Sequence, residues 1–340
     1  MRAKPLIYNS LLALTSLLFF YLQLNVAIKA ALGQVPLITA ALCLCCFKTG
    51  ELLHEVFDIQ YHPLFTLIWV SAFVGSQFFL GQWWLYLIFS YFMMSCRATL
   101  LTVSAKKYKV LGRAVGFVIS PISCSTILSL SAIALGLFCL IAVPAKRLHA
   151  QVFLPFANRS FPKNKYTYLA MSVHHFHYFA YCYSIPILVT RTSNVSPLWI
   201  GLIFYLGWSA YNAYERFIKP SYLWIISGHI VAAGALLWMY FDHGLFSLLI
   251  GWFLTGLGGG TVYMIPSLLR PPLEFTKQDM AVAEGIGHIT GMVTWLFFAV
   301  YYSDYSPLLV GAFGAIATIP IVYKAKKQLT SRDRESDVRI

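Results

Sequence analysis

Long apolar segments follow one another along almost the whole of this 340-residue chain, from Leu6 to Tyr323, with only short polar breaks. A helix that crosses a lipid bilayer needs about 20 mostly apolar residues. Charged residues make up 11% of the chain, whereas they make up about a quarter of a typical soluble domain. The sequence therefore predicts an all-α polytopic membrane protein whose main partner is the lipid bilayer, and its net charge of +13 is not taken as a sign of nucleic-acid binding.

The apolar segments divide into about twelve predicted transmembrane helices. They cover residues 6–27, 34–54, 63–80, 83–104, 111–126, 128–144, 166–190, 197–216, 221–241, 244–266, 280–302 and 306–323. The apolar run from 111 to 144 is too long for one ordinary span, so we expect two short helices that break near residues 125–129. A count of eleven spans stays open.

The basic residues favour one orientation of the chain in the membrane. With the N-terminus in the cytoplasm, all but three of the 25 Lys and Arg residues fall on the cytoplasmic side. Lys29 and Arg191 face outward, and Arg97 lies inside a span. Because cytoplasmic loops carry an excess of Lys and Arg, we predict that both termini are cytoplasmic and that the protein resides in the plasma membrane or inner membrane of the cell.

One internal connection is longer than the others. It covers residues 145–165, is basic, and follows the sixth predicted span. It separates a six-helix half in residues 1–144 from a second six-helix half in residues 166–323, and residues 324–340 remain as a cytoplasmic tail. Two repeats around a binding site near the bilayer midplane are typical of secondary transporters.

Motifs at the predicted cytoplasmic ends of the spans carry a family resemblance. Residues 48–58 are similar to a loop signature that contains a Gly, an Asp and a basic residue. Gly50 matches that signature, while His54 stands in place of its Asp and Glu55 in place of its basic residue. Arg97 lies where many proton-coupled members of the same family carry an arginine inside the membrane.

Two further segments resemble the same family. Residues 109–116 resemble the segment with which members of that family begin the fifth span. Residues 214–219 lie where the second repeat would place its copy of the loop signature. By these motifs and by its topology, the chain resembles a short, divergent member of the major facilitator superfamily. The resemblance implies a monomeric secondary transporter that moves a small solute by alternating access, without a cofactor and without enzyme activity.

Acidic residues at the cytoplasmic end of the second span suggest a gate. Glu51, His54, Glu55 and Asp58 share one helical face, at a spacing of three or four residues. Together with the loop motifs they give these gating candidates: Gly50, Glu51, His54, Glu55, Asp58, Arg113 and Arg216. A solvated helix end is an alternative interpretation, and a metal-dependent membrane transferase acting on lipid-linked substrates is another.

The seventh predicted span carries the most unusual polar residues. His174, His177, Tyr178 and Tyr181 recur at helical spacing and form one stripe, whereas His175 points about 100° away from it. Ionisable residues inside a membrane usually mark a pathway or a binding site. We expect the stripe to bind substrate or to carry protons. Bundle-stabilising hydrogen bonds are an alternative, and a metal site at His174 and His177 is a further one that would need additional ligands.

The eleventh and ninth predicted spans add other histidines. Glu284 and His288 lie one turn apart on one face and form a candidate proton site. His229 in the ninth span is interpreted as a structural residue. Arg97 and Glu284 are candidates for binding an anion or a proton.

The function predicted from these residues is secondary active transport of a small polar solute: a zwitterion, a carboxylate or a metal chelate. Transport of a transition metal or a metallophore through the histidine stripe is one alternative. A haem-containing redox protein with His175, His229 and His288 as axial ligands is another.

Overall fold

The computed structural model describes residues 3–79, 81–122, 125–143, 150–152, 161–192, 197–217, 219–264, 268 and 276–337. Helices account for nearly all of this part of the chain. Eight of them are long and apolar enough to cross a membrane by length and composition, and a ninth, shorter helix is also apolar. The prediction of an all-α, multi-pass membrane protein is therefore confirmed.

The chain divides into two compact units. The first contains Met1–Phe153 and Asn194–Tyr205, and the second contains Leu154–Ser193 and Leu206–Ile340. Helix α9 (Pro197–Phe217) contributes residues to both.

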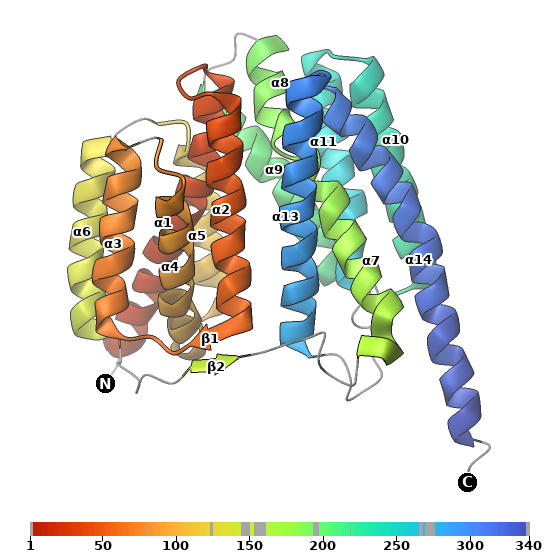
Figure 1. Cartoon of the computed structure of the whole chain (residues 1–340), viewed down its shortest axis with the longest axis horizontal. Helices are drawn as coiled ribbons and strands as arrows, with labels where there is room; N and C mark the ends of the chain where they lie inside the picture. The colour runs from red at the N-terminus through yellow and green to blue at the C-terminus, as the bar shows by residue number, and fades with distance from the viewer. Residues whose placement is uncertain are drawn as a thin grey trace. The chain divides into compact units, whose positions relative to one another are not determined.

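The first unit is a bundle built mainly from six helices (Figure 1). They are α1 (Ala3–Ala31), α2 (Leu37–Val56), α3 (Pro63–Phe78), α4 (Trp84–Val103), α5 (Lys106–Ile119) and α6 (Ser125–Ala142). Helix α1 packs along α5, and α4 packs between α2 and α3. The apolar run at 111–144 forms two helices as predicted, but α6 already begins at Ser125, earlier than expected.

A short antiparallel pair of strands also belongs to the first unit. It joins β1 (Phe57–Ile59), directly after α2, to β2 (Ala150–Val152), with Asp58 opposite Gln151. The second strand lies within the connection that was predicted at 145–165. No strand was expected there, and the main-chain hydrogen bonds of three residues on each side are too local to leave an apolar periodicity in the sequence.

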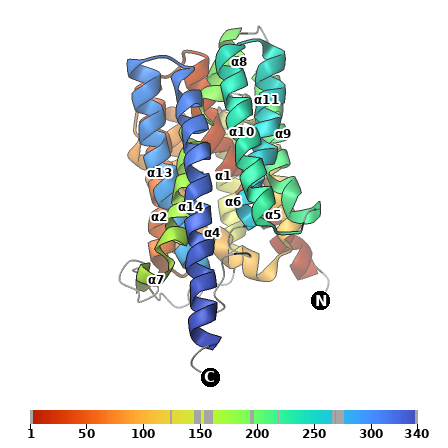
Figure 2. The same ribbon diagram turned by 90° about the vertical axis from the view of Figure 1, so that its right-hand side faces the viewer.

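The second unit packs around α7 (Phe161–Phe179). Its other helices are α8 (Ser184–Thr192), α10 (Tyr222–Phe241), α11 (Leu245–Gly259), the 3₁₀ helix η2 (Gly260–Tyr263), α13 (Lys277–Tyr301) and α14 (Ser306–Asp337). Helices α13 and α14 both pack against α7, and α10 packs against α11 and α14. Figure 2 shows α14 along its full length, which continues as a helix well beyond the predicted span end at residue 323.

The seventh predicted span is not one continuous helix. Helix α7 ends at Phe179, a turn covers residues 180–183, and α8 begins at Ser184. The expectation of one helix over 166–190 is therefore wrong. Pro186 lies in the first turn of α8, where proline is tolerated in a helix but would disrupt the interior of a longer one.

Glycines allow the neighbouring helices to approach α7 closely. A Cβ atom at Gly287 of α13 would overlap the carbonyl oxygen of Ser172, and one at Gly314 of α14 would overlap the Cβ atom of His177. Small residues at helix crossings are typical of membrane bundles because association there depends on close packing. These two contacts fix the backbone that carries the histidines.

Candidate functional site

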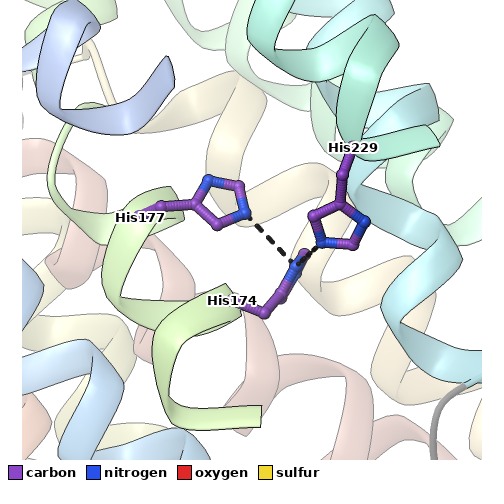
Figure 3. A group of neighbouring side chains, drawn as sticks. All are labelled: His174, His177 and His229. Carbon is purple, nitrogen blue, oxygen red and sulfur yellow. Dashed lines mark hydrogen bonds between the residues drawn. The ribbon is translucent and has the colours of Figure 1, made fainter. Parts of the chain in front are cut away.

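Three histidines of the second unit converge on one point (Figure 3). His174 and His177 lie one turn apart on α7, and His229 lies on α10; all three are completely buried. The Nδ1 atom of His174 is 3.0 Å from Nε2 of His229 and 3.3 Å from Nε2 of His177. Within the described chain, this trio is the group of His, Cys, Asp or Glu side chains that could hold a metal ion, with its ligand atoms within 4.8 Å of one another.

The hydrogen bonds assign the protons of the neutral trio. Nδ1 of His229 lies 2.7 Å from the carbonyl oxygen of Ile225, which can only accept, so this nitrogen carries the hydrogen. Its Nε2 is then an acceptor, and Nδ1 of His174 must donate to it. Nε2 of His174 consequently accepts from the hydroxyl of Tyr211 at 3.2 Å. Of the three nitrogens that face one another, only Nδ1 of His174 carries a hydrogen. Nε2 of His177 and Nε2 of His229 point their lone pairs toward it.

His177 completes this arrangement. Because Nδ1 of His174 donates, Nε2 of His177 accepts, and the hydrogen of His177 must be on its own Nδ1. That Nδ1 atom is buried and has no hydrogen-bond partner among the residues that the structure describes. An unsatisfied buried donor costs about 1–3 kcal/mol. A functional role for His177 would explain why the protein retains it despite this loss of stability.

Aromatic side chains line the same region. The ring of Tyr178 stacks with Trp252 at 6.0 Å between centroids and lies 5.6 Å from the ring of Tyr211. Tyr181 lies in the turn after α7, and its ring stacks with that of His177 at 6.4 Å. The structure thus brings together all four residues of the predicted stripe, although Tyr181 is beyond the end of the helix.

Sequence reasoning missed two members of this cluster. His229 was interpreted as a structural residue, and Tyr211 was not singled out. His229 does make a local hydrogen bond to Ile225, but its other nitrogen faces His174. Only the crossing of α10 with its neighbours brings it there, and Tyr211 carried no signal among the chain's 21 tyrosines.

A second polar cluster adjoins the first. Nε2 of His288 on α13 lies 3.1 Å from Nδ1 of His175 on α7, and Nε2 of His175 lies 3.6 Å from a carboxylate oxygen of Glu284. The side chains of His175 and Glu284 are 7% and 23% exposed. Glu284 and His288 therefore share one face of α13, as expected, and His175 joins them. Imidazole and carboxylate groups in contact can exchange a proton.

Arg97 lies in the first unit. Among the described residues, its guanidinium donates no hydrogen bond to a carboxylate. It is on α4, only 3% exposed, with its guanidinium 4.1 Å from the ring centre of Phe19 and 5.2 Å from that of Phe20. Arg113 on α5 also lies over Phe20, at 4.3 Å. The rings stabilise the two cations by cation–π attraction. In the described part of the chain, the Nε atom of Arg97 has no hydrogen-bond partner.

The structure describes the side chains of some, but not all, of the predicted gating residues. Glu51 accepts from Lys48 at 2.8 Å on the same helix, and His54 is buried with its ring against Tyr91. A Cβ atom at Gly50 would overlap Ser90, so this glycine lets α2 approach α4 closely. Glu55 is half-buried at the end of α2. The side chains of Asp58 and Arg216 lie outside the described part of the structure.

The three histidines proposed for haem do not flank a porphyrin. His175 and His288 are in direct hydrogen-bond contact with each other. His229 faces His174 instead. Axial ligands must lie on opposite faces of the iron with the macrocycle between them, so the arrangement does not fit the redox interpretation.

No family sequence model matches the chain, and no curated protein matches it by sequence. Its fold is similar to solved structures. One is the crystal structure of the human organic anion transporter MFSD10 (TETRAN), at 13% identity and a TM-score of 0.56, covering 94% of this chain and 99% of that one.

A second similar structure is a bacterial homologue of the human lysosomal transporter Spinster, in an inward-facing and unoccupied conformation. It is 12% identical, the TM-score is 0.60, and the likeness covers 98% of both chains. At this identity the likeness concerns the fold, and it extends over essentially the whole length of the three chains. The chain therefore shares its fold with these two transporter structures.

Proposed function

We propose that this protein is a secondary transporter of the major facilitator superfamily that moves a small polar solute across a membrane by alternating access. The observation that carries the proposal is the buried cluster of His174, His177, His229 and Tyr211 inside a bundle with this fold. Polar residues in a membrane protein's interior are costly and are usually retained for function.

The chemistry of the cluster favours a solute with both charged and polar groups. Imidazole can donate or accept a hydrogen bond, and the tyrosine hydroxyls can do the same. The rings of Tyr178 and Trp252 add apolar contact surface beside them. Such a lining suits a zwitterion, a carboxylate or a metal chelate better than a lipid tail.

Proton coupling is assigned to the second cluster. Glu284 and His288 on α13 face His175 on α7, and a proton bound there would change the charge between two helices in contact. Such a local charge change can bias a two-state transporter. The sequence contains no nucleotide-hydrolysis motif, so the energy for transport would come from an ion gradient, here of protons, or from the solute's own gradient.

The remaining predictions are part of the same proposal. The two six-helix halves, residues 1–144 and 166–323, would move about the solute site, with the 145–165 connection, the 324–340 tail and both termini in the cytoplasm. Arg97 would attract an anionic group, since its guanidinium is buried and its Nε atom bonds to none of the described residues. The gating candidates would close the cytoplasmic side: Gly50, Glu51, His54, Glu55, Asp58, Arg113 and Arg216. The protein would work as a monomer and carry out no covalent chemistry.

The test is transport by the purified protein in proteoliposomes that contain a pH-sensitive dye. An isotope-labelled panel of amino acids and small carboxylates is added outside, and both uptake and internal pH are followed. We expect uptake of at least one solute with simultaneous acidification, and loss of uptake in His174→Gln. Protein-containing vesicles that take up no more than empty vesicles for every solute, with and without zinc salts in the panel, would refute the proposal.

A further inference from the structure

We propose that Nδ1 of His174, Nε2 of His177 and Nε2 of His229 together bind one divalent transition-metal ion. This proposal deepens the proposed function. It rests on that function in one respect, which is that the metal is part of the transported solute. It adds His229 of α10 as a third ligand to the metal site that the sequence placed at His174 and His177 alone, and it defines the class of substrate as a metal complex.

The spacing of the three nitrogens fits a metal site. Zinc–nitrogen bonds are about 2.0–2.1 Å long and four-coordinate sites are tetrahedral, which places neighbouring ligand nitrogens roughly 3.3 Å apart. The separations from Nδ1 of His174 are 3.0 Å to Nε2 of His229 and 3.3 Å to Nε2 of His177. All three ligand atoms lie within 4.8 Å of one another, so a metal ion can take the place of the single hydrogen once the rings of His177 and His229 adjust to tetrahedral spacing.

Two of the rings already have the outer contacts that histidine ligands need. A metal-bound histidine usually donates its other N–H to a fixed acceptor. Nδ1 of His229 donates to the carbonyl of Ile225. When a metal binds Nδ1 of His174, the proton of that ring moves to Nε2, where the oxygen of Tyr211 lies at 3.2 Å. All three rings stay neutral, so no net proton has to leave the site.

The ligand set leaves the fourth coordination position open. Structural zinc sites have four protein ligands, whereas three leave a position for water or another ligand. In the described part of the chain no carboxylate or thiolate belongs to the group, so three neutral imidazoles would hold a double positive charge in a buried place. A buried charge without compensation is costly. We therefore infer that the ion binds together with a small anionic ligand from solution, such as a carboxylate.

The nature of the ligands narrows the metal. Imidazole nitrogens suit zinc, copper, nickel and iron, whereas magnesium and calcium prefer oxygen. The proposal therefore predicts binding of Zn²⁺ and of its spectroscopic substitute Co²⁺, and little binding of Mg²⁺ or Ca²⁺.

The test is titration of the purified full-length protein in detergent with Co²⁺, with citrate-free buffer and added acetate as the anionic ligand. We expect the visible absorption bands of four-coordinate cobalt to saturate at one ion per chain and to disappear on addition of Zn²⁺. His177→Gln should abolish the bands. Tyr211→Phe should weaken cobalt binding about 10–100-fold, because it removes only an outer contact.

His243→Gln is the matched control, because His243 is an exposed histidine of the same unit, between α10 and α11. It should bind cobalt like the wild type. Size-exclusion profiles and thermal stability identify any variant that fails to fold. If His177→Gln does not fold, the weaker cobalt binding expected of Tyr211→Phe still tests the site. Absence of the bands in the wild type, or equal bands in His177→Gln, would overturn the metal site.

The outcomes separate this inference from the proposed function. A wild type that binds no cobalt but carries an organic solute into vesicles would overturn the metal site alone. A wild type that binds cobalt at the histidines but moves neither Zn²⁺ nor any organic solute would overturn the transporter role and the claim that the metal is cargo.

Discussion

Replacement of Gly287 by alanine should separate α13 from α7 and destabilise the protein. The added Cβ atom would overlap the carbonyl oxygen of Ser172 and would lie 2.8 Å from Cβ of His175 and 2.9 Å from the backbone nitrogen of Phe176, whereas ordinary contacts begin at 3.4 Å. The overlapping atoms belong to backbone or to Cβ positions, so no side-chain rotation relieves them and the helices themselves must move apart.

The size of the effect follows from two opposing terms. Overpacking of a well-packed interior costs about 1–3 kcal/mol, and the better helix propensity of alanine returns up to about 1 kcal/mol. We expect a net loss of about 1–2 kcal/mol. A change of 1 kcal/mol shifts the melting temperature by about 2–4 °C for units of 150–250 residues, so the melting temperature in detergent should fall by roughly 2–8 °C.

Gly234→Ala is the matched control for this measurement. Gly234 lies in α10 of the same unit, and an added Cβ atom there meets no atom within 4 Å. Its melting temperature should equal or exceed that of the wild type. If Gly287→Ala melted at the same temperature as Gly234→Ala or above it, the close packing of α13 on α7 would be refuted.

Three further predictions follow from single contacts. Glu284→Gln should abolish solute-driven acidification of proteoliposomes but preserve exchange of labelled for unlabelled solute, because it removes the carboxylate beside His175; equal loss of both would contradict a role in proton coupling. Trp295→Phe should lower stability by about 1 kcal/mol, because its indole N–H donates to the hydroxyl of Ser184 at the start of α8; an unchanged melting temperature would argue against this contact. Hydrogen bonds from Ser247 and from the backbone of Gly244 lower the pKa of Asp242 below its usual value. The stabilisation from Asp242 should therefore be complete above pH about 4 and be lost as the pH falls through the lower folded-state pKa, and Asp242→Asn should remove that part of the pH dependence of the melting temperature.

Much of the fold could be predicted from apolar segments and charges. The membrane class and the fold follow from long apolar segments with short breaks, because a bilayer dictates the length of each helix. The break between α7 and α8 was not predicted. It falls within an uninterrupted apolar and aromatic stretch, 180–183, where neither charge nor polarity marks a boundary.

The site was only half predictable for a related reason. Helical spacing placed His174 and His177 on one face, since the distance between them along α7 depends on that helix alone. The partners of these residues come from other helices. Whether His229 meets His174, and whether His175 meets His288, depends on how helices cross, which one sequence does not specify.

We propose that the protein moves a small solute through the histidine cluster. The most direct measurement is the content of metals and small organic solutes in cells, by mass spectrometry, for wild type, a His174→Ala/His177→Ala double variant and empty vector at equal expression. We expect at least one metal or solute to differ between wild type and empty vector and to return to the empty-vector level in the double variant. Three coinciding profiles, or a wild-type difference that the double variant retains in full, would contradict it.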